Sequence, residues 1–586
     1  MKLRIFVALL LIPGIVFAET TLRVGNDIVV KGRPTFDHQI HHGYAEYRFT
    51  VENHSPDRSH LVRVALEAPQ QHTGLTIEKE VQVPPGEQLS FTMYANRYKN
   101  YFNMTATVDG GQLRRSEFSE INTGSFNHFG STRTSLLASR TVNSDDLQNR
   151  IESINGWTGT GAFNDHYALR RTDLPMEEWS DNWLAYSAFD GIILYSQDFE
   201  TIPPGALSAL RQYAENGGSL LIVGDMELPW QGRTINLQEA SQDSKRYDIG
   251  LGRCLIHREA STSFGWLDRI DIDSLEQARR AFPLVGEPLY EINSRFPVTD
   301  NLTMPVRGFL LLVSLFALVA GPITILLLAK MNRRIWLLWL IPLESAVACG
   351  IVLCYSFLSE GITPTVRMEG ITVLDQERHQ ATTWGMLGYY CPQKPSGGLF
   401  FPADWEVNPI TENTYTYAAP ETRYHIDWTR GQHFTKGAIE ARVPSFFYVQ
   451  NNAIRRERLE VIEENGRPVA VVNGLGADIE ELWLRDADNR SYHVDSIRAG
   501  QRIDLPKPDV RVAFGSIADL QYLASQQFLD MQKTILKTTP ERYLVPGTYI
   551  ATLSGAPFME SGLGARKVKM TAGQIVYGIL PIEVQP

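Results

Sequence analysis

Two long runs of hydrophobic residues lie near the middle of the chain. Residues 308–329 carry no charged side chain, and residues 335–357 are nearly as apolar, with Glu344 as their one ionisable group. A helix over the first run would be about 33 Å long, which matches the hydrocarbon core of a bilayer. The pattern therefore predicts two transmembrane helices.

A short polar break, residues 330–334, separates the two runs. It contains Lys330, Arg333 and Arg334. Short loops rich in lysine and arginine stay in the cytoplasm. The break therefore predicts a cytoplasmic turn, with the regions before and after the two helices both on the opposite side of the membrane.

The first residues have the pattern of a secretory signal peptide. Two cations precede an apolar stretch that is too short to span a bilayer comfortably, and small residues, Val16 and Ala18, come before Glu19. We expect cleavage after Ala18, which removes residues 1–18. An uncleaved anchor is the alternative, and it leaves the same topology.

The two outer regions have the period of β-strands. Residues 19–125 alternate apolar and polar positions, as in "HLVRVALE", and predict a β-sandwich. Residues 362–586 predict further β-rich structure, with a second sandwich from about residue 455 that repeats an Asn-containing turn and a Gly-containing turn of the first. A helical insertion is expected over residues 520–536.

Residues 130–262 have a different pattern. "FDGIILYS" and "SLLIVGD" are continuous apolar runs, typical of strands that are covered on both faces, and a helix with prolines at its start and glycines at its end lies between them. Strand, helix and strand at this spacing predict a βαβ unit in an α/β domain. Residues 263–306 are expected to be a linker.

The composition excludes several classes of function. The net charge is −11, which disfavours nucleic-acid binding. The four cysteines form no CxxC pair, so no zinc ribbon is expected, and we predict no cofactor or metal. A disulfide between Cys254 and Cys391 is one alternative for these two residues, and two free thiols are the other.

Features within the membrane runs predict contact with another membrane protein. Small residues recur at four-residue spacing, as at Ala317 and Gly321, which allows close helix approach in lipid. Glu344 lies near mid-membrane, where a carboxylate is costly unless it is protonated or paired. It contacts a partner subunit, takes part in proton transfer, or is protonated and bonded to a hydroxyl such as that of Ser345 or Thr324.

Two segments carry a resemblance to a known family. "GPITILLLAKMNRRIWLLWLIP" resembles a hairpin of uncharacterised bacterial inner-membrane proteins, with Gly-Pro in the first helix and a basic turn. "FDGIILYS" and the helix and strand that follow it are similar to a class I glutamine amidotransferase-like, flavodoxin-like domain. The resemblance implies a periplasmic location for the domains and an association with MoxR-type AAA+ ATPases and von Willebrand factor A domain membrane proteins.

The cysteine nucleophile of such amidotransferases is missing, although His257 and Glu259 match their His-x-Glu pattern by letters. The turn after "SLLIV" begins with Gly224 and contains no cysteine. Cys254 precedes His257 by three residues on one predicted strand, so their side chains point to opposite faces. We therefore expect a degenerate, non-enzymatic domain. Asp225, Glu227 and His257 are the candidates for ligand binding at the carboxyl edge of the sheet.

The sequence as a whole predicts a multidomain α+β membrane protein of the bacterial inner membrane, with two spans and periplasmic N- and C-terminal domains. Its expected role is that of a binding or assembly subunit of an envelope complex, linked to any MoxR-type ATPase only indirectly. The alternatives are a periplasmic hydrolase of cell-wall peptides or sugars and a transmembrane signalling subunit.

Overall fold

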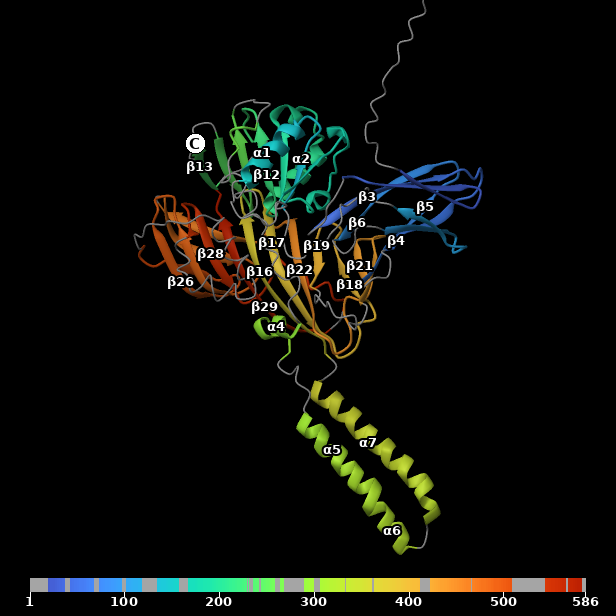
Figure 1. The fold of residues 1–586 in the computed structure, drawn as a ribbon. Helices are drawn as coiled ribbons and strands as arrows, with labels where there is room; N and C mark the ends of the chain where they lie inside the picture. Colours follow the sequence, from blue (N-terminus) through green and yellow to red (C-terminus); the bar gives the residue numbers. More distant parts are fainter. Residues whose placement is uncertain are drawn as a thin grey trace, which may run out of the picture.

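A computed structural model of the chain shows a β-rich molecule of several domains, with several sheets and few helices (Figure 1). The structure describes residues 19–36, 43–67, 73–96, 102–118, 134–156, 167–228, 230, 235–241, 244–258, 264–267, 289–299, 306–331, 334–360, 363–410, 422–464, 466–508, 543–564 and 567–581. The expected signal peptide, the expected helix 520–536 and Arg333 lie outside these residues.

The N-terminal region forms two sheets that face each other. The first has the order β1-β2-β3-β6, with strands Thr20–Val24, Ile28–Pro34, Tyr44–Asn53 and Gln88–Asn96. The second contains β5 (Thr73–Val83), β4 (His60–Glu67), β7 (Phe102–Val108) and β8 (Arg114–Phe118). The alternating "HLVRVALE" segment is β4 with the bounds expected from its pattern. The Pro-Pro-Gly turn, where Gly86 has a φ of 67°, carries the chain from β5 in one sheet to β6 in the other.

The second of these sheets also contains strands from far along the chain. Its full order is β18-β21-β20-β5-β4-β7-β8, where β18 is Leu399–Phe401, β20 is Thr422–Asp427 and β21 is Gln432–Lys436. β20 lies parallel to β5, with Thr422 opposite Thr73 and Asp427 opposite Glu78. Segments before and after the hydrophobic hairpin therefore share one sheet.

The middle region contains a seven-stranded sheet with the order β10-β9-β11-β12-β15-β14-β13. Its strands are β9 Thr134–Ala138, β10 Tyr167–Arg171, β11 Gly191–Tyr195, β12 Ser219–Val223, β13 Ile235–Ser241, β14 Ser244–Ile249 and β15 Gly252–His257. The first five strands in this order run parallel to one another. β14 runs antiparallel to β15, and β13 runs antiparallel to β14. The expected βαβ unit is confirmed as β11, α2 (Pro204–Glu215) and β12.

Helices cover both faces of this sheet. The buried side of α2 packs with Ile192, Leu220 and Cys254. Side chains of α1 (Ser144–Gly156) pack on the other face with Ile193 and Leu221, the neighbours of two of these residues along their strands. Successive strand residues point to opposite faces, so both faces are apolar and both are buried. Short 3₁₀ turns, η1 Met176–Glu178, η2 Trp183–Tyr186 and η3 Ser196–Glu200, complete the region.

The residues after the hairpin form an eight-stranded sheet with the order β19-β22-β17-β16-β29-β28-β25-β26. Its strands are β16 Thr365–Asp375, β17 Gln380–Tyr390, β19 Glu406–Pro409, β22 Ser445–Ile454, β25 Ile479–Arg485, β26 Ser491–Ile497, β28 Thr548–Leu553 and β29 Lys569–Ile579. A three-stranded sheet packs on its far end and consists of β23 Arg458–Glu464, β24 Arg467–Gly474 and β27 Arg502–Asp504.

A buried carboxylate joins the middle region to the eight-stranded sheet. Glu215, at the end of α2, accepts hydrogen bonds from Arg211 Nε at 2.9 Å, Arg378 Nη1 at 2.8 Å and Asn452 Nδ2 at 2.7 Å. Burial raises the pKa of Glu215 despite these cations, since removal of water is the largest influence on it. Nearby, Trp384 Nε1 donates to the carbonyl of Asn216 at 3.2 Å.

The hydrophobic hairpin projects away from the folded body (Figure 1). After α4 (Leu289–Arg295), it consists of α5 Val306–Leu318, a π-helical turn η4 Val319–Ile323, α6 Thr324–Lys330, the 3₁₀ turn η5 Arg334–Trp336 and α7 Leu337–Glu360. The π-helical turn contains Pro322.

The expectation of two membrane spans is supported only in part. Within the described residues, Val313–Lys330 is long and apolar enough to cross a bilayer, with a mean hydropathy of 2.1, and 11% of it is buried. The apolar stretch described in α7, Leu337–Ile351, is shorter. The structure therefore supports one candidate span, and the second span stays a prediction.

Candidate functional site

The carboxyl edge of the parallel strands is the first candidate for a functional site. From β9 the chain passes through α1 to β10 on one side, and it then returns to β11 on the other side of β9. Open α/β sheets bind ligands in the crevice outside the strands where the order reverses in this way. The relevant residues are those that follow β9 and β11.

A buried carboxylate occupies this position. Asp198 is 2% exposed, and its Oδ2 accepts hydrogen bonds from Ser139 Oγ at 2.7 Å and from the backbone N–H of Tyr195 at 2.9 Å. Thr141 Oγ1 lies 2.8 Å from its Oδ1. These groups hold the ends of β9 and β11 together, so the Asp198 carboxylate serves the fold rather than an incoming ligand.

The sequence analysis did not identify this cluster. Ser139 and Thr141 follow the short apolar run of β9, and Asp198 follows Tyr195 by three residues. Short polar residues after a strand are equally typical of an ordinary loop. The feature that points to this position is the reversal of strand order, and it can be recognised only once the topology is known.

Asp225, Glu227 and His257 belong to the same edge of the sheet, as expected for residues at the ends of β12 and β15. Val223 lies opposite His257, and the N–H of Gly224 donates to the His257 carbonyl at 2.8 Å. Asp225 and Glu227 are exposed. Burial raises the pKa of Tyr247 on β14, and the charges of Glu227 and Asp225 add smaller increases.

His257 differs from the two acids because its ring is buried. It is 3% exposed and stacks on Trp266, with the ring centres 3.7 Å apart and the planes at 9°. Its Nδ1 lies 3.1 Å from the hydroxyl of Ser244. The strand positions therefore bring the three predicted residues to one edge, but the imidazole is held in packing while the two carboxylates face solvent.

The turn after β12, which contains no cysteine, begins with a glycine in a conformation that side chains rarely adopt. Gly224 has a φ of 118°, and a Cβ there would lie 2.2 Å from Ser196 Oγ. Cys254 packs with α2, on the face of the sheet opposite that of His257 and Trp266. Burial raises the pKa of the Cys254 thiol well above its usual range, which disfavours the reactive thiolate.

The alternative of a disulfide between Cys254 and Cys391 is not realised. Both thiols are free and buried. Cys254 lies within β15 of the seven-stranded sheet, whereas Cys391 follows β17 of the eight-stranded sheet. The two residues therefore belong to separate layers of the molecule, and each thiol is part of an apolar core.

Glu344 contacts a hydroxyl of the facing helix, one of the alternatives that its sequence position left open. Thr324 Oγ1 donates to Glu344 Oε1 at 2.6 Å and lies 2.8 Å from the carbonyl of Val319. The hydroxyl carries one proton, so it donates to one of these two oxygens at a time. Glu344 Oε2 has no hydrogen-bond partner among the described residues.

The other residues predicted in the hairpin have separate positions. A Cβ added at Gly321 would meet no atom within 4 Å, so Gly321 is not used for close packing between the described helices of this chain. Lys330 is the last residue of α6, and Arg334 begins η5. These two cations flank the turn at the end of the hairpin that is remote from the folded body (Figure 1).

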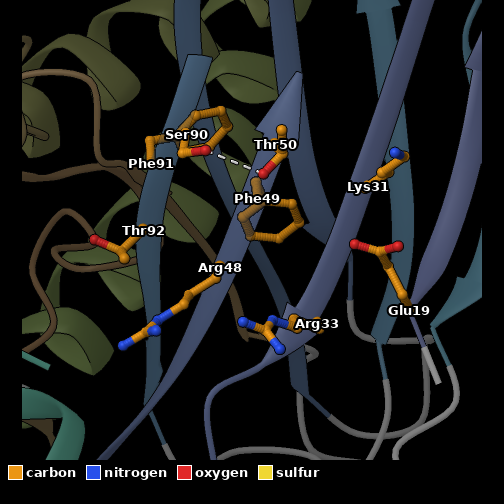
Figure 2. A pocket seen from close by; sticks show the side chains of 9 residues that line it. All are labelled: Glu19, Lys31, Arg33, Arg48, Phe49, Thr50, Ser90, Phe91 and Thr92. Carbon is orange, nitrogen blue, oxygen red and sulfur yellow. Dashed lines mark hydrogen bonds between the residues drawn. The ribbon is translucent and has the colours of Figure 1, made fainter. Parts of the chain in front are cut away.

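A hollow of about 480 Å³ lies on the first sheet of the N-terminal sandwich. Figure 2 shows Lys31, Arg33 and Arg48 along it, beside the stacked rings of Phe49 and Phe91. Each of the three cations lies within 3.0 Å of a glutamate oxygen, the partners being Glu52, Glu178 and Glu46. The positive charges are thus already balanced, and the hollow has no excess charge to attract an anion.

Comparisons with known proteins give no assignment. No protein-family model matches the chain, and no curated protein matches it. Among solved structures it is similar to a Northeast Structural Genomics Consortium target, at 11% identity over 18% of this chain and 98% of that one, with a TM-score of 0.13. A Bordetella pertussis protein described as ApaA has 11% identity over 16% and 87% of the two chains, with a TM-score of 0.12.

A third solved structure is a β-glucuronidase from glycoside hydrolase family 2. The match covers 33% of this chain and 20% of the β-glucuronidase chain, with 12% identity and a TM-score of 0.12. All three scores are too low to carry an argument about fold or function.

Proposed function

We propose that this protein is a two-pass inner-membrane subunit that holds all of its folded domains in the periplasm and uses them for binding or assembly in an envelope complex. The observation that carries the proposal is the parallel pairing of β5 with β20. Those strands come from opposite sides of the hairpin in the sequence, yet they are neighbours in one sheet.

This pairing limits the topology. Two strands of one sheet lie on the same side of a membrane, so the chain crosses an even number of times between residues 83 and 422. Val313–Lys330 supplies one candidate crossing. α7 runs back toward the body and is the element available for the return crossing, as Figure 1 illustrates. This argument favours a two-pass hairpin over a single span.

The direction of insertion rests on the sequence. Lys330, Arg333 and Arg334 surround the turn, and basic turns are retained in the cytoplasm. The expected signal peptide sends the chain after residue 18 outward, which agrees with the same arrangement. The β-rich body would therefore lie in the periplasm.

A binding role is favoured over catalysis by the carboxyl edge of the parallel sheet. The turn that begins with Gly224 contains no cysteine, Cys254 is buried on the other face of the sheet, and Asp198 accepts hydrogen bonds from Ser139 and Thr141. We propose that the three-layered domain is a degenerate class I amidotransferase-like scaffold. Its exposed Asp225 and Glu227 would then belong to a binding surface.

The size of the turn limits how a cytoplasmic partner is engaged. A stable contact buries about 800 Å² on each partner, which the few residues between α6 and α7 cannot provide. Any MoxR-type ATPase would therefore be coupled through another membrane subunit. Glu344 and Gly321 are the positions proposed to face that subunit, because Glu344 Oε2 has no partner in the described chain and Gly321 faces open space.

Topology is the first test. Reporter enzymes fused near residue 200, near residue 500 and in the turn after Lys330 should be active in the periplasm, the periplasm and the cytoplasm, respectively. A cytoplasmic signal at either of the first two positions would reject the proposal.

Crosslinking in native membranes tests the role. Photo-crosslinkers at Gly321 should capture a membrane protein, and an Ile351 crosslinker, elsewhere on the hairpin, provides the comparison. The triple variant Asp225→Ala, Glu227→Ala, His257→Ala separates the hydrolase alternative: loss of the cellular phenotype with unchanged complex assembly would favour an enzyme. A ligand-dependent change in crosslinking between α5 and α7 would favour the signalling subunit.

A further inference from the structure

Three side chains that can bind a metal ion meet on the outer face of the β25–β26 hairpin. Glu481 lies on β25, directly opposite Asp495 on β26, and His493 lies two residues before Asp495 on the same face. β26 is the last strand of the eight-stranded sheet, at the periphery of the molecule (Figure 1). The three side chains are 31%, 81% and 36% exposed for Glu481, Asp495 and His493, so an ion can reach them from solvent.

The distances fit the coordination shell of a small divalent ion. His493 Nε2 lies 3.0 Å from Glu481 Oε1 and 3.4 Å from Asp495 Oδ1, and the three ligand atoms all lie within 4.8 Å of one another. Ligands at about 2.0–2.1 Å from a tetrahedral zinc ion are about 3.3 Å apart. A modest rearrangement of the exposed Asp495 would complete three corners of that tetrahedron.

A fourth residue orients two of the ligands. Trp483 Nε1 donates to Glu481 Oε1 at 3.1 Å. The Trp483 ring also stacks on His493, with centres 3.8 Å apart and planes at 25°. Partners of this kind fix the direction of metal ligands and raise affinity. The outer face of the hairpin is thus more ordered around Glu481 and His493 than a set of freely rotating surface side chains.

The charges also favour a cation. Glu481 and Asp495 are a directly opposed cross-strand pair, and like charges in that position destabilise a sheet. A divalent ion between them removes this repulsion. An imidazole nitrogen with two carboxylates is a donor set typical of zinc, whereas calcium and magnesium prefer oxygen donors alone.

We propose that Glu481, His493 and Asp495 form a zinc site, with the fourth coordination position open to solvent. The site joins β26, the edge strand, to β25, its neighbour in the sheet. It does not depend on the membrane topology or on the role proposed above, because all of its residues lie within one sheet.

The test uses the full-length protein in detergent, purified without a histidine tag and stripped of metal with a chelator. Zinc is then titrated in competition with a fluorescent zinc indicator, and calcium is titrated in parallel. His38, His41 and His42 are replaced by alanine in a background variant, because imidazoles of that histidine-rich segment, which lies outside the described residues, would compete for zinc. We expect this background to retain one zinc equivalent and to bind calcium far more weakly.

Variants of the site give the decisive comparison. In the same background, His493→Ala should abolish stoichiometric zinc binding, and Trp483→Phe, which keeps the stacking but loses the N–H, should weaken it about tenfold. His425→Ala is the matched control, since His425 Nε2 lies 3.2 Å from a Glu78 oxygen in a two-residue pair. Cobalt in place of zinc should give the visible absorption of a four-coordinate ion.

Two results would overturn the proposal. One is the absence of a zinc equivalent in the histidine-depleted background. The other is unchanged zinc affinity in the His493→Ala variant, which would mean that Glu481, His493 and Asp495 do not form the zinc site. Circular dichroism and thermal melting of each variant without metal establish that a lost site does not reflect a lost fold.

Discussion

Asn53 forms a buried corner where the N-terminal sandwich turns between its sheets. Its N–H donates to the Glu87 carbonyl at 2.9 Å, its Nδ2 donates to the Val83 carbonyl at 3.0 Å, and its Oδ1 accepts from the Ser55 N–H at 3.0 Å. The Asn53 side chain therefore satisfies backbone groups at two separate turns.

Asn473 repeats this arrangement near the other end of the chain. Its N–H donates to the Gln501 carbonyl at 3.0 Å, its Nδ2 donates to the Ile497 carbonyl at 3.0 Å, and its Oδ1 accepts from the Leu475 N–H at 3.1 Å. In both corners the residue after a glycine of positive φ provides the first carbonyl. Two sandwiches thus use one device to join a pair of turns.

We predict that Asn53→Ala destabilises the N-terminal sandwich by about 2–4 kcal/mol, because several buried backbone groups lose their partner at once. Since the molecule has several domains, the effect should appear as a lower melting temperature for one transition rather than for all. Gln82→Ala, at an exposed position with one side-chain hydrogen bond, is the control. Equal melting of the two variants would contradict the prediction.

Asp375 gives a prediction about pH. Burial, and then the charge of Glu377, raise its pKa from 3.8 to about 6. An acid whose folded-state pKa is above its unfolded value contributes stability that is fully present below about pH 4 and is lost as the pH rises through 6. The other charged groups around it are Arg211, Arg378, His379 and Glu215.

Asp375→Asn should therefore raise the melting temperature at pH 7.5, with a gain of about 1–3 kcal/mol, and change it little at pH 4.5. The side-chain oxygen of the variant can still accept from the backbone N–H of Arg378, whose nitrogen lies 3.1 Å from Asp375 Oδ1. Thermal melts of both proteins at the two pH values measure the difference. A gain of the same size at both would show that the ionisation of Asp375 is not responsible.

At the scale of elements, local patterns predicted what is local. The βαβ unit of β11, α2 and β12 was readable because its apolar runs and its Pro and Gly signals lie within one short segment. The repeated Asn-containing and Gly-containing turns were readable for the same reason, but the hydrogen bonds that join them were not. The edge position of Asp225 and Glu227 followed directly from where β12 ends.

What the sequence did not reveal depends on long-range pairing. β5 lies between β4 and β20, and no local feature of β5 indicates that β20 is one of its two neighbours. The expectation of a sandwich over residues 19–125 did not include the strands β18, β20 and β21. The burial of His257 also escaped prediction, because Trp266 reaches it from a segment that carries no strand or helix pattern.

The β5–β20 pairing can be tested directly. Thr76 and His425 are opposite each other in the parallel register. Cysteines at these two positions should form a disulfide under mild oxidation, and cleavage at a protease site inserted between residues 411 and 421 should leave the two fragments linked until a reductant is added. Ser90→Cys with His425→Cys is the control and should not crosslink. Absence of the first crosslink would remove the main support for the two-pass topology.

The contact between α6 and α7 is a second element-scale test. Thr324→Val removes the hydroxyl that bonds to Glu344 at 2.6 Å but keeps the shape of the side chain. Polar contacts between membrane helices contribute about 0.5–2 kcal/mol. In bicelles, the hairpin of this variant should therefore open at a lower SDS concentration. A pair of dyes attached at Leu315 and Val347 measures the opening. Ser345→Ala, which removes the other candidate hydroxyl, should behave as the unaltered protein does; the reverse order would assign the contact to Ser345.

At the scale of the whole molecule, the hairpin is an insertion into a body that closes without it. Arg367, just after the hairpin, donates to the Pro297 carbonyl at 3.0 Å and lies over the Phe296 ring at 4.8 Å. Phe296 and Val298 also pack into the core of the eight-stranded sheet. The chain therefore enters and leaves the hairpin at neighbouring points of one folded surface.

Replacement of residues 300–362 by a short Gly-Ser linker should therefore give a protein that is exported, remains in the soluble fraction and melts as the full chain does. The reason is that the pairing of β5 with β20 and of β16 with β29 and the network around Glu215 all lie outside the deleted segment. Full-length protein, fractionated in parallel, should stay with the membranes. The same deletion carrying Asn53→Ala should show the lowered transition of that variant, which establishes that the melt reports on the native body. An insoluble or unfolded product would mean that the helices form part of the core, and the separation into a lipid-embedded hairpin and an independent body would be wrong.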